Sequence, residues 1–156
     1  MIYISHRGNL DGINSDRENS PSYINECLEL GHDCEIDLRM WNGVPYLGHD
    51  SADYPVSKNW LIERKDNLWI HVKEYAALVW LMENCPMCKF FCHESDRYTL
   101  TSNGYVWSHD LDNQMTKKCI VPLLSLESVK SYGQTGFYAV CSDYINSAVL
   151  KFGDQK

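Results

Sequence analysis

Glu35 and Asp37 are separated by one residue in the segment CEIDLRMW, residues 34–41, which has the composition of a strand. Alternate residues of a strand point to the same face, so both carboxylates project together. Two neighbouring carboxylates repel each other unless a cation lies between them, and such oxygen ligands suit Mg²⁺ or Ca²⁺. The same spacing is common on exposed strand faces, so the pair alone favours a solvated surface over a metal site.

Histidines and basic residues occupy the ends of two other predicted strands. His6 and Arg7 follow the β-forming segment 2–5, and His71 and Lys73 share one face of LWIHVK, residues 68–73. A single histidine in such a place is more often structural than a ligand. Polar side chains at three successive strand ends indicate a shared site, because the chemistry of α/β barrels collects at the carboxyl ends of strands.

Strands and helices alternate around these residues. Ser20 as the cap, Pro21 in the first turn and Gly31 as the stop predict a helix over 20–31. A second helix is predicted over 74–84, and residues 51–66 are polar and predicted to be irregular. The remaining expected elements are strands at 89–92, 105–108, 119–124 and 137–141 and short helices at 125–133 and 143–153. Such alternation is typical of parallel βαβ units.

The second half of the chain lacks room for crossover helices. About a dozen residues separate Cys92 from Tyr105, near the minimum for a helical crossover, and fewer separate Ser108 from Cys119. A complete eight-stranded α/β barrel takes about 250 residues, whereas this chain has 156. We therefore predict one α/β domain over residues 1–156, a reduced or incomplete TIM-type (β/α) barrel from which several outer helices are missing.

Composition narrows the classes of partner and compartment. Acidic residues outnumber basic ones by 21 to 14, giving a net charge of −7 that disfavours nucleic acid. A small anionic substrate remains compatible, because local cations can reverse the field inside a pocket. The seven cysteines cannot all pair within the chain. No signal peptide or membrane-spanning run is evident, and we expect a cytoplasmic protein without a transmembrane segment.

Five short motifs resemble the glycerophosphodiester phosphodiesterase family in order and spacing. They are HRG at 6–8, ENS at 18–20, EIDLR at 35–39, GVPYLGHD at 43–50 and HVK at 71–73. The family pattern runs HRG, ENT, ExD, a turn with V and HD, then ExK. The segment FYAVCSDY also resembles the family's last strand. The resemblance is strong over residues 2–73, and the ordered set is more specific than any single motif.

The resemblance implies a metal-dependent α/β barrel, related in fold to phosphatidylinositol-specific phospholipase C, that hydrolyses a glycerophosphodiester or a sugar or glycerol phosphodiester. The implied site residues are an acid–base pair, His6 and His49; substrate-binding or orienting residues, Arg7, Glu18 and Lys73; and metal ligands, Glu35, Asp37 and His71. Two imidazoles can exchange the roles of proton donor and acceptor across a phosphodiester, while the metal and the arginine stabilise the added charge.

One ligand departs from the family pattern, because His71 stands where the family has a glutamate. Imidazole is a poorer ligand for Mg²⁺ or Ca²⁺ and a better one for Mn²⁺ or Zn²⁺, which leaves the choice of metal open. We expect segments 34–41 and 68–73 to be parallel neighbours that bring His71 inward beside the carboxylates. Two alternatives stay open: a phosphodiester-binding module that has lost turnover, and a lyase that releases a cyclic phosphate.

Two further groups of residues have competing interpretations. Glu94, Asp96 and His109 could complete the pocket, although base rates favour polar loop residues. Four residues have spacing compatible with a zinc site, namely Cys85, Cys88, Cys92 and His93. Because Cys92 lies in a predicted strand, buried free cysteines are the favoured interpretation.

Overall fold

The computed structural model describes residues 1–153, so the end of the predicted domain, at residue 156, lies outside the described residues. Within them the chain forms ten strands and five helices. The strands are β1 (Ile2–His6), β2 (Asp33–Trp41), β3 (Val44–Leu47), β4 (Tyr54–Pro55), β5 (Leu68–Val72), β6 (Lys89–Cys92), β7 (Tyr98–Leu100), β8 (Val106–Ser108), β9 (Cys119–Pro122) and β10 (Ala139–Ser142). The helices are α1 (Pro21–Glu29), α2 (Lys58–Glu63), α3 (Tyr75–Asn84), α4 (Leu126–Ser131) and α5 (Ile145–Phe152).

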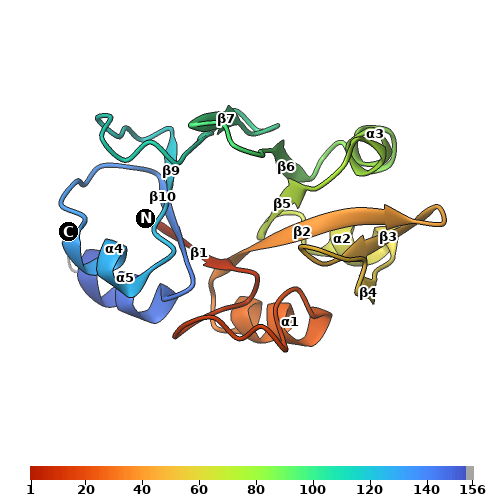
Figure 1. The fold of residues 1–156 in the computed structure, drawn as a ribbon, viewed down its shortest axis with the longest axis horizontal. Helices are drawn as coiled ribbons and strands as arrows, with labels where there is room; N and C mark the ends of the chain where they lie inside the picture. Colours follow the sequence, from red (N-terminus) through yellow and green to blue (C-terminus); the bar gives the residue numbers. More distant parts are fainter. Residues whose placement is uncertain (154–156) are drawn as a thin grey trace.

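The strands form one curled, mixed sheet that makes an open half-barrel (Figure 1). Its parallel part runs in the order β6–β5–β2–β1–β10–β9–β8. The β3–β4 hairpin extends β2 in the antiparallel sense, and β7 pairs antiparallel with β8. The predicted α/β class and the parallel pairing of the segments that became β2 and β5 are confirmed.

The sheet has no strand ladder between β6 and β7 within residues 1–153. The two sides nevertheless lie next to each other. Ser102 N donates a hydrogen bond to Phe90 O at 2.8 Å, and Phe90 N donates to Ser102 Oγ at 3.0 Å. A few loop contacts therefore take the place of a ladder there.

Helices cover only part of the outside of the sheet (Figure 1). Helices α1, α2 and α3 lie on the side of β2 and β5, and α4 and α5 lie on the side of β9, β10 and β1. From residue 93 to residue 118 the described chain contains β7, β8 and loops but no helix. The short connections predicted for the second half of the chain are confirmed.

Local signals explain the first helix and one error of prediction. The Ser20 hydroxyl accepts a hydrogen bond from Tyr23 N at 3.4 Å and Pro21 takes the first turn, as predicted for α1. The prediction that residues 51–66 are irregular is wrong, because β4 and α2 lie there. Ser57 caps α2 by accepting a bond from Trp60 N at 3.0 Å, and Leu61 is buried against the core.

Apolar side chains fill the interior of the half-barrel. Ile4, Trp69, Phe91, Trp107 and Ile120 come from five different strands and form one buried cluster. Because this cluster excludes water from the middle of the sheet, the polar side chains at the carboxyl ends of the strands form a separate layer above it. No helix among the described residues is long and apolar enough to cross a membrane.

Candidate functional site

Strand register brings the predicted residues together at the carboxyl ends of β1, β2 and β5. His6 pairs with Glu35 across β1 and β2, and Asp37 pairs with His71 across β2 and β5. Neighbouring parallel strands end at the same edge of a sheet, so these side chains project into one region. A one-residue shift in the register between β1 and β2, or between β2 and β5, would turn the side chains of the shifted strand toward the outer layer.

Glu35, Asp37 and His71 form a group that could hold a metal ion, with one ligand atom from each lying within 4.8 Å of the others. His71 Nδ1 lies 3.2 Å from Asp37 Oδ1 and 3.6 Å from Glu35 Oε1. Glu35 is 2% exposed and Asp37 is fully buried. The prediction that His71 points inward toward the two carboxylates is confirmed.

The donor set fits a divalent cation. Glu35 Oε2 and Asp37 Oδ1 are buried without a hydrogen-bond partner, which is costly for a carboxylate unless a cation approaches it. His71 Nε2 donates to His93 O at 2.9 Å, so its proton is fixed on the far side of the ring. Nδ1 can then offer a lone pair toward Glu35 and Asp37, the arrangement usual for a metal-ligating histidine.

Without a cation, His71 itself neutralises the pair. Burial lowers the pKa of His71, but the close approach of Asp37 and Glu35 outweighs this and raises the pKa to about 9. Burial raises the pKa of Asp37, whereas the close approach of protonated His71 and the charge of Arg7 hold it well below its usual range. The negative charge of Glu35 and Asp37 can therefore be neutralised either by a proton on His71 or by a cation among the three side chains.

A second layer of contacts fixes Asp37. Arg7 Nε lies 2.8 Å from Asp37 Oδ2, and Lys73 Nζ lies 3.6 Å from Oδ1. Asn19 Nδ2 donates to Oδ2 at 2.9 Å and Asn19 Oδ1 accepts from the Asp37 backbone N–H at 2.9 Å. Asn19 is the middle residue of the ENS motif, and its positioning role was not predicted.

Glu18 holds the guanidinium of Arg7 from the other side. Its Oε2 lies 3.3 Å from Arg7 Nη1, and its Oε1 accepts from Asn9 Nδ2 at 2.6 Å. Asn9 also donates to Asp143 Oδ1 at 2.7 Å. Glu18 and Asn9 thus connect Arg7 with Asp143, the residue that follows the last strand. This position fits the orienting role expected for Glu18.

His6 is oriented by Asp143, which the sequence interpretation did not assign to the site. His6 Nδ1 donates to Asp143 Oδ1 at 2.7 Å, and its Nε2 lies 3.8 Å from Glu35 Oε2. Burial lowers the pKa of His6, but the bond to Asp143 and the charge of Glu35 raise it above its ordinary value. In the sequence Asp143 stands just after the predicted strand 137–141, in the segment FYAVCSDY. Its burial, at 2% exposure, appears only in the structure.

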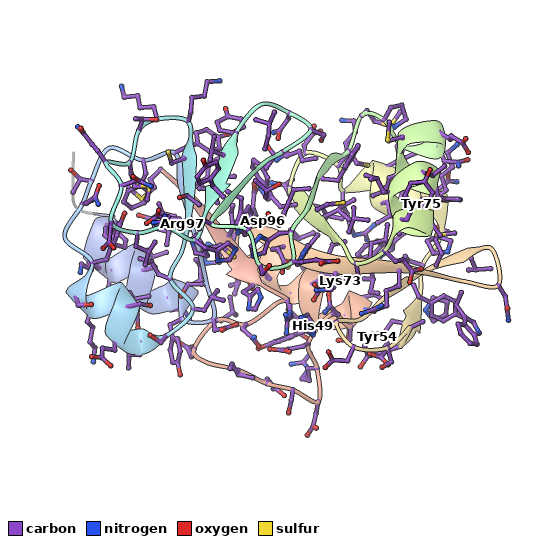
Figure 2. All side chains as sticks on the ribbon, turned by 45° about the horizontal axis from the view of Figure 1, so that its top comes forward. His49, Tyr54, Lys73, Tyr75, Asp96 and Arg97 are labelled. Atoms are coloured by element: carbon purple, nitrogen blue, oxygen red, sulfur yellow. The ribbon has the colours of Figure 1, made fainter. Side chains whose placement is uncertain are left out.

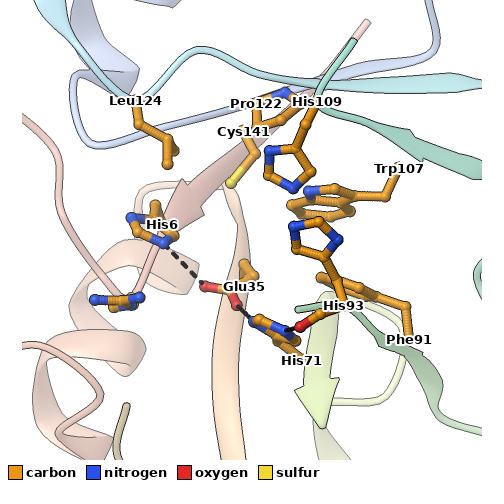
Figure 3. Close-up of a pocket in the computed structure, with 11 residues that line it drawn as sticks. His6, Glu35, His71, Phe91, His93, Trp107, His109, Pro122, Leu124 and Cys141 are labelled. Atoms are coloured by element: carbon orange, nitrogen blue, oxygen red, sulfur yellow. Dashed lines mark hydrogen bonds and ion pairs between the residues drawn. The ribbon is translucent and has the colours of Figure 1, made fainter. Parts of the chain in front are cut away.

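A cavity of about 140 Å³ opens beside these groups (Figure 3). One wall carries His6, Arg7, Glu35 and His71. The remaining lining residues are Phe91, His93, Trp107, His109, Pro122, Leu124 and Cys141. A cavity of this size holds about six non-hydrogen atoms, comparable to benzene.

Of Glu94, Asp96 and His109, the histidine is an exposed loop residue, as the favoured interpretation has it, but it also lines this cavity, as the alternative has it. His109 stacks on His93 with ring centroids 4.1 Å apart and an angle of 13° between the planes. Glu94 lines a neighbouring cavity, whereas Asp96 lies exposed on the loop after β6 (Figure 2). The stacking could not be foreseen because sixteen positions separate the two histidines in the chain.

His49 lies apart from the cavity of His6. It lines a second cavity of about 470 Å³ together with Lys73, and the two residues lie on the same side of the molecule (Figure 2). His49 Nδ1 bonds to Asp50 Oδ1 at 2.8 Å, and the Arg39 guanidinium donates to the carbonyl of His49. The two cavities share His71 in their linings.

The cysteines do not form the alternative zinc site. Cys85 and Cys88 are buried in the core, whereas Cys92 is exposed. Glu35, Asp37 and His71 are the one group with metal-binding geometry among residues 1–153. All seven cysteines of the chain are free thiols.

No family model matches the chain, and neither the curated proteins nor the solved structures give a match. The geometry of the site therefore carries the functional argument. All predicted site residues except His49 belong to one connected network of ion pairs and hydrogen bonds, in which the contact between His71 and Asp37 joins the two halves.

Proposed function

We propose that this chain is a metal-dependent phosphodiester hydrolase that acts on a glycerophosphodiester-like or sugar or glycerol phosphodiester. The observation that carries the proposal is the orientation of His71, whose Nδ1 faces two buried carboxylates while Nε2 is held by a backbone carbonyl. This metal-ligand geometry lies directly beside His6 and Arg7 in one cavity. The motif resemblance over residues 2–73 supports the same reaction class.

Each side chain has a task in this reaction. Arg7 supplies a fixed positive charge for the phosphate, because Asp37 and Glu18 hold its guanidinium in place. Asp143 fixes Nδ1 of His6, so Nε2 is the atom that can move a proton on the cavity side. Lys73 adds positive charge next to Asp37. When bound by Glu35, Asp37 and His71, a divalent cation would stabilise the charge that develops on the phosphoryl oxygens.

We interpret the open half-barrel as a reduced TIM-type barrel. The parallel order β1, β2, β5, β6 follows the chain direction as in a barrel, and the polar residues lie at the carboxyl ends of the strands. The loops over 93–118 take the place of outer helices.

Hydrolysis assays with Mg²⁺, Ca²⁺ or Mn²⁺ test the proposal. With glycerophosphocholine or bis(p-nitrophenyl) phosphate, we expect His6→Ala and Glu35→Gln each to lower kcat by about 10²–10⁴. His32→Ala and Glu29→Gln, which change the same residue types outside the site, should leave it unchanged. Calorimetry should show Mn²⁺ binding lost in Glu35→Gln only. Full activity in both site variants would contradict the proposal, and ³¹P NMR of the product distinguishes a monoester from a cyclic phosphate.

A phosphodiester-binding module without turnover is the second candidate. The observation that favours it is the self-neutralised state of the site, in which Arg7, Lys73 and a protonated His71 surround Asp37. In that case calorimetry would detect binding of a phosphodiester, and no metal among those tested would give product.

A further inference from the structure

The cavity that contains His6 has a second imidazole on its opposite side. Figure 3 shows His109 and His93 across the pocket from His6, with Glu35 and His71 below them. His109 directly follows β8, and its backbone N donates to Arg97 O at 2.8 Å. The β7–β8 hairpin therefore fixes the backbone that carries this ring.

The ring of His109 is supported by aromatic packing. It stacks on His93 at 4.1 Å, and His93 is tied to His71 through its own carbonyl. Phe91 and Trp107, which line the same cavity, stack with centroids 4.3 Å apart. The wall opposite His6 is thus made of stacked rings, and the stacking of His109 on His93 suits a group acting at a defined point of a ligand.

His49 has none of these relations to His6. It lines the neighbouring cavity and bonds to its own neighbour in sequence, Asp50, whose side chain is 93% exposed. A phosphate held between His6 and Arg7 would have His109, and not His49, within the same cavity.

His109 is poised as a proton acceptor. His109 is an exposed residue by its overall surface, but desolvation of its ring at the cavity wall lowers its pKa to about 4, and the nearby His93, His71 and His6 act in the same direction. The ring is therefore neutral near pH 7 and keeps a lone pair, as a general base requires.

We propose that His109, rather than His49, is the second imidazole of the reaction and acts across the substrate from His6, with His93 as the positioning residue behind it. This inference rests on the proposed hydrolase function. His109 takes a proton from the water that attacks phosphorus, the bond between phosphorus and the leaving alkoxide breaks, and the alkoxide receives a proton from His6. The products are a phosphomonoester and an alcohol, and solvent returns the proton from His109 to His6.

Two substitutions of one residue separate catalysis from packing. His109→Phe keeps a ring against His93 but removes both nitrogens, whereas His109→Ala leaves a space of about the size of imidazole. We expect kcat to fall by about 10²–10⁴ in both, while calorimetry shows inorganic phosphate bound as in the wild type. Added imidazole should restore part of the activity of His109→Ala and none of that of His109→Phe. His49→Ala should stay within about threefold of the wild type.

The outcomes distinguish the inference from the function on which it rests. Full activity in His109→Phe with a large loss in His49→Ala would overturn the inference and leave the hydrolase intact. A loss in both His109 variants without rescue by imidazole, together with weakened phosphate binding, would assign His109 a structural role and also overturn it. If the wild type hydrolyses no phosphodiester with any of the three metals, the proposed function fails and this inference fails with it.

Discussion

At the scale of single residues, the charge of the site depends on the protonation of His71. The ring either carries a proton or stays neutral and leaves Nδ1 free to bind a cation. The ring fills the position where the resemblance places a carboxylate ligand, and it lies 3.2 Å from Asp37 Oδ1 and 3.6 Å from Glu35 Oε1. As an imidazolium it neutralises the buried pair, and as a neutral imidazole it becomes a nitrogen ligand. A nitrogen among the ligands favours Mn²⁺ or Zn²⁺ over Mg²⁺ or Ca²⁺.

Replacing His71 by glutamate should change the preferred metal. We expect His71→Glu to bind Mg²⁺ and Ca²⁺ at least tenfold more tightly than the wild type in calorimetry, because a third oxygen ligand suits hard cations. His71→Gln, of the same size but neutral, is the matched control and should show no such gain. Equal Mg²⁺ affinity in the wild type and His71→Glu would contradict the assignment of His71 as a ligand.

At the scale of elements, the turn after β1 determines where Arg7 points. Arg7 has a φ of 56° and Gly8 a φ of 94°, so the chain turns back through the left-handed region at two successive residues. A Cβ at Gly8 would lie 2.7 Å from Tyr23 Cδ1 on α1. The HRG motif thus needs its glycine because helix α1 packs against the turn.

Substituting this glycine should therefore affect both stability and the site. We expect Gly8→Ala to lower the free energy of unfolding by about 1–3 kcal/mol in urea and to weaken phosphate binding through displacement of Arg7. Gly31→Ala is the control, because Gly31 also has a positive φ, 84°, but its added Cβ would meet nothing within 4 Å. An equal loss of stability in the two variants would show that contact with Tyr23 is unimportant.

The same elements show which parts of the site could be predicted from the sequence. Period-two patterns and short crossovers predicted β1, β2 and β5, and with them the meeting of His71 with Glu35 and Asp37. The positions of Asp143 and His109 depend instead on β10 and β8 closing the other side of the sheet, a long-range pairing without a local signal. Helix α2 was missed because its stretch is short and polar apart from Trp60, Leu61 and Ile62.

At the scale of the whole molecule, the chain closes its site by bringing its two ends together. Strand β10 pairs with β1, so Asp143 near the carboxyl terminus meets His6 and Asn9 near the amino terminus. On the opposite side, the 93–118 segment supplies His93 and His109 without any covering helix. The half-barrel thus collects titratable groups from both ends and the middle of the chain, and its stability must depend on pH.

The sign of the pH dependence of folding stability follows from the direction in which each histidine's pKa is shifted. His6 and His71 have raised pKa values, so below about pH 5.5 both are protonated in the folded and unfolded states and contribute almost no slope. His109 has a pKa lowered to about 4. Between pH 6.5 and 4 the unfolded chain takes up a proton there that the folded chain refuses, so stability falls as the pH falls.

His109→Phe should remove this contribution. In urea titrations of the metal-free protein at pH 7, 6, 5 and 4.5, we expect the wild type to lose more of its free energy of unfolding with falling pH than the variant does. His93, whose pKa is also lowered by burial, is present in both proteins. If the ring at position 109 still stacks on His93, the difference in stability between the wild type and His109→Phe therefore reports on His109 alone. His49→Phe changes a half-buried loop histidine that lies outside this cavity and should follow the wild type. Parallel pH profiles for the wild type and His109→Phe would mean that His109 is not held neutral against His93 and would remove the physical basis for its role as a proton acceptor.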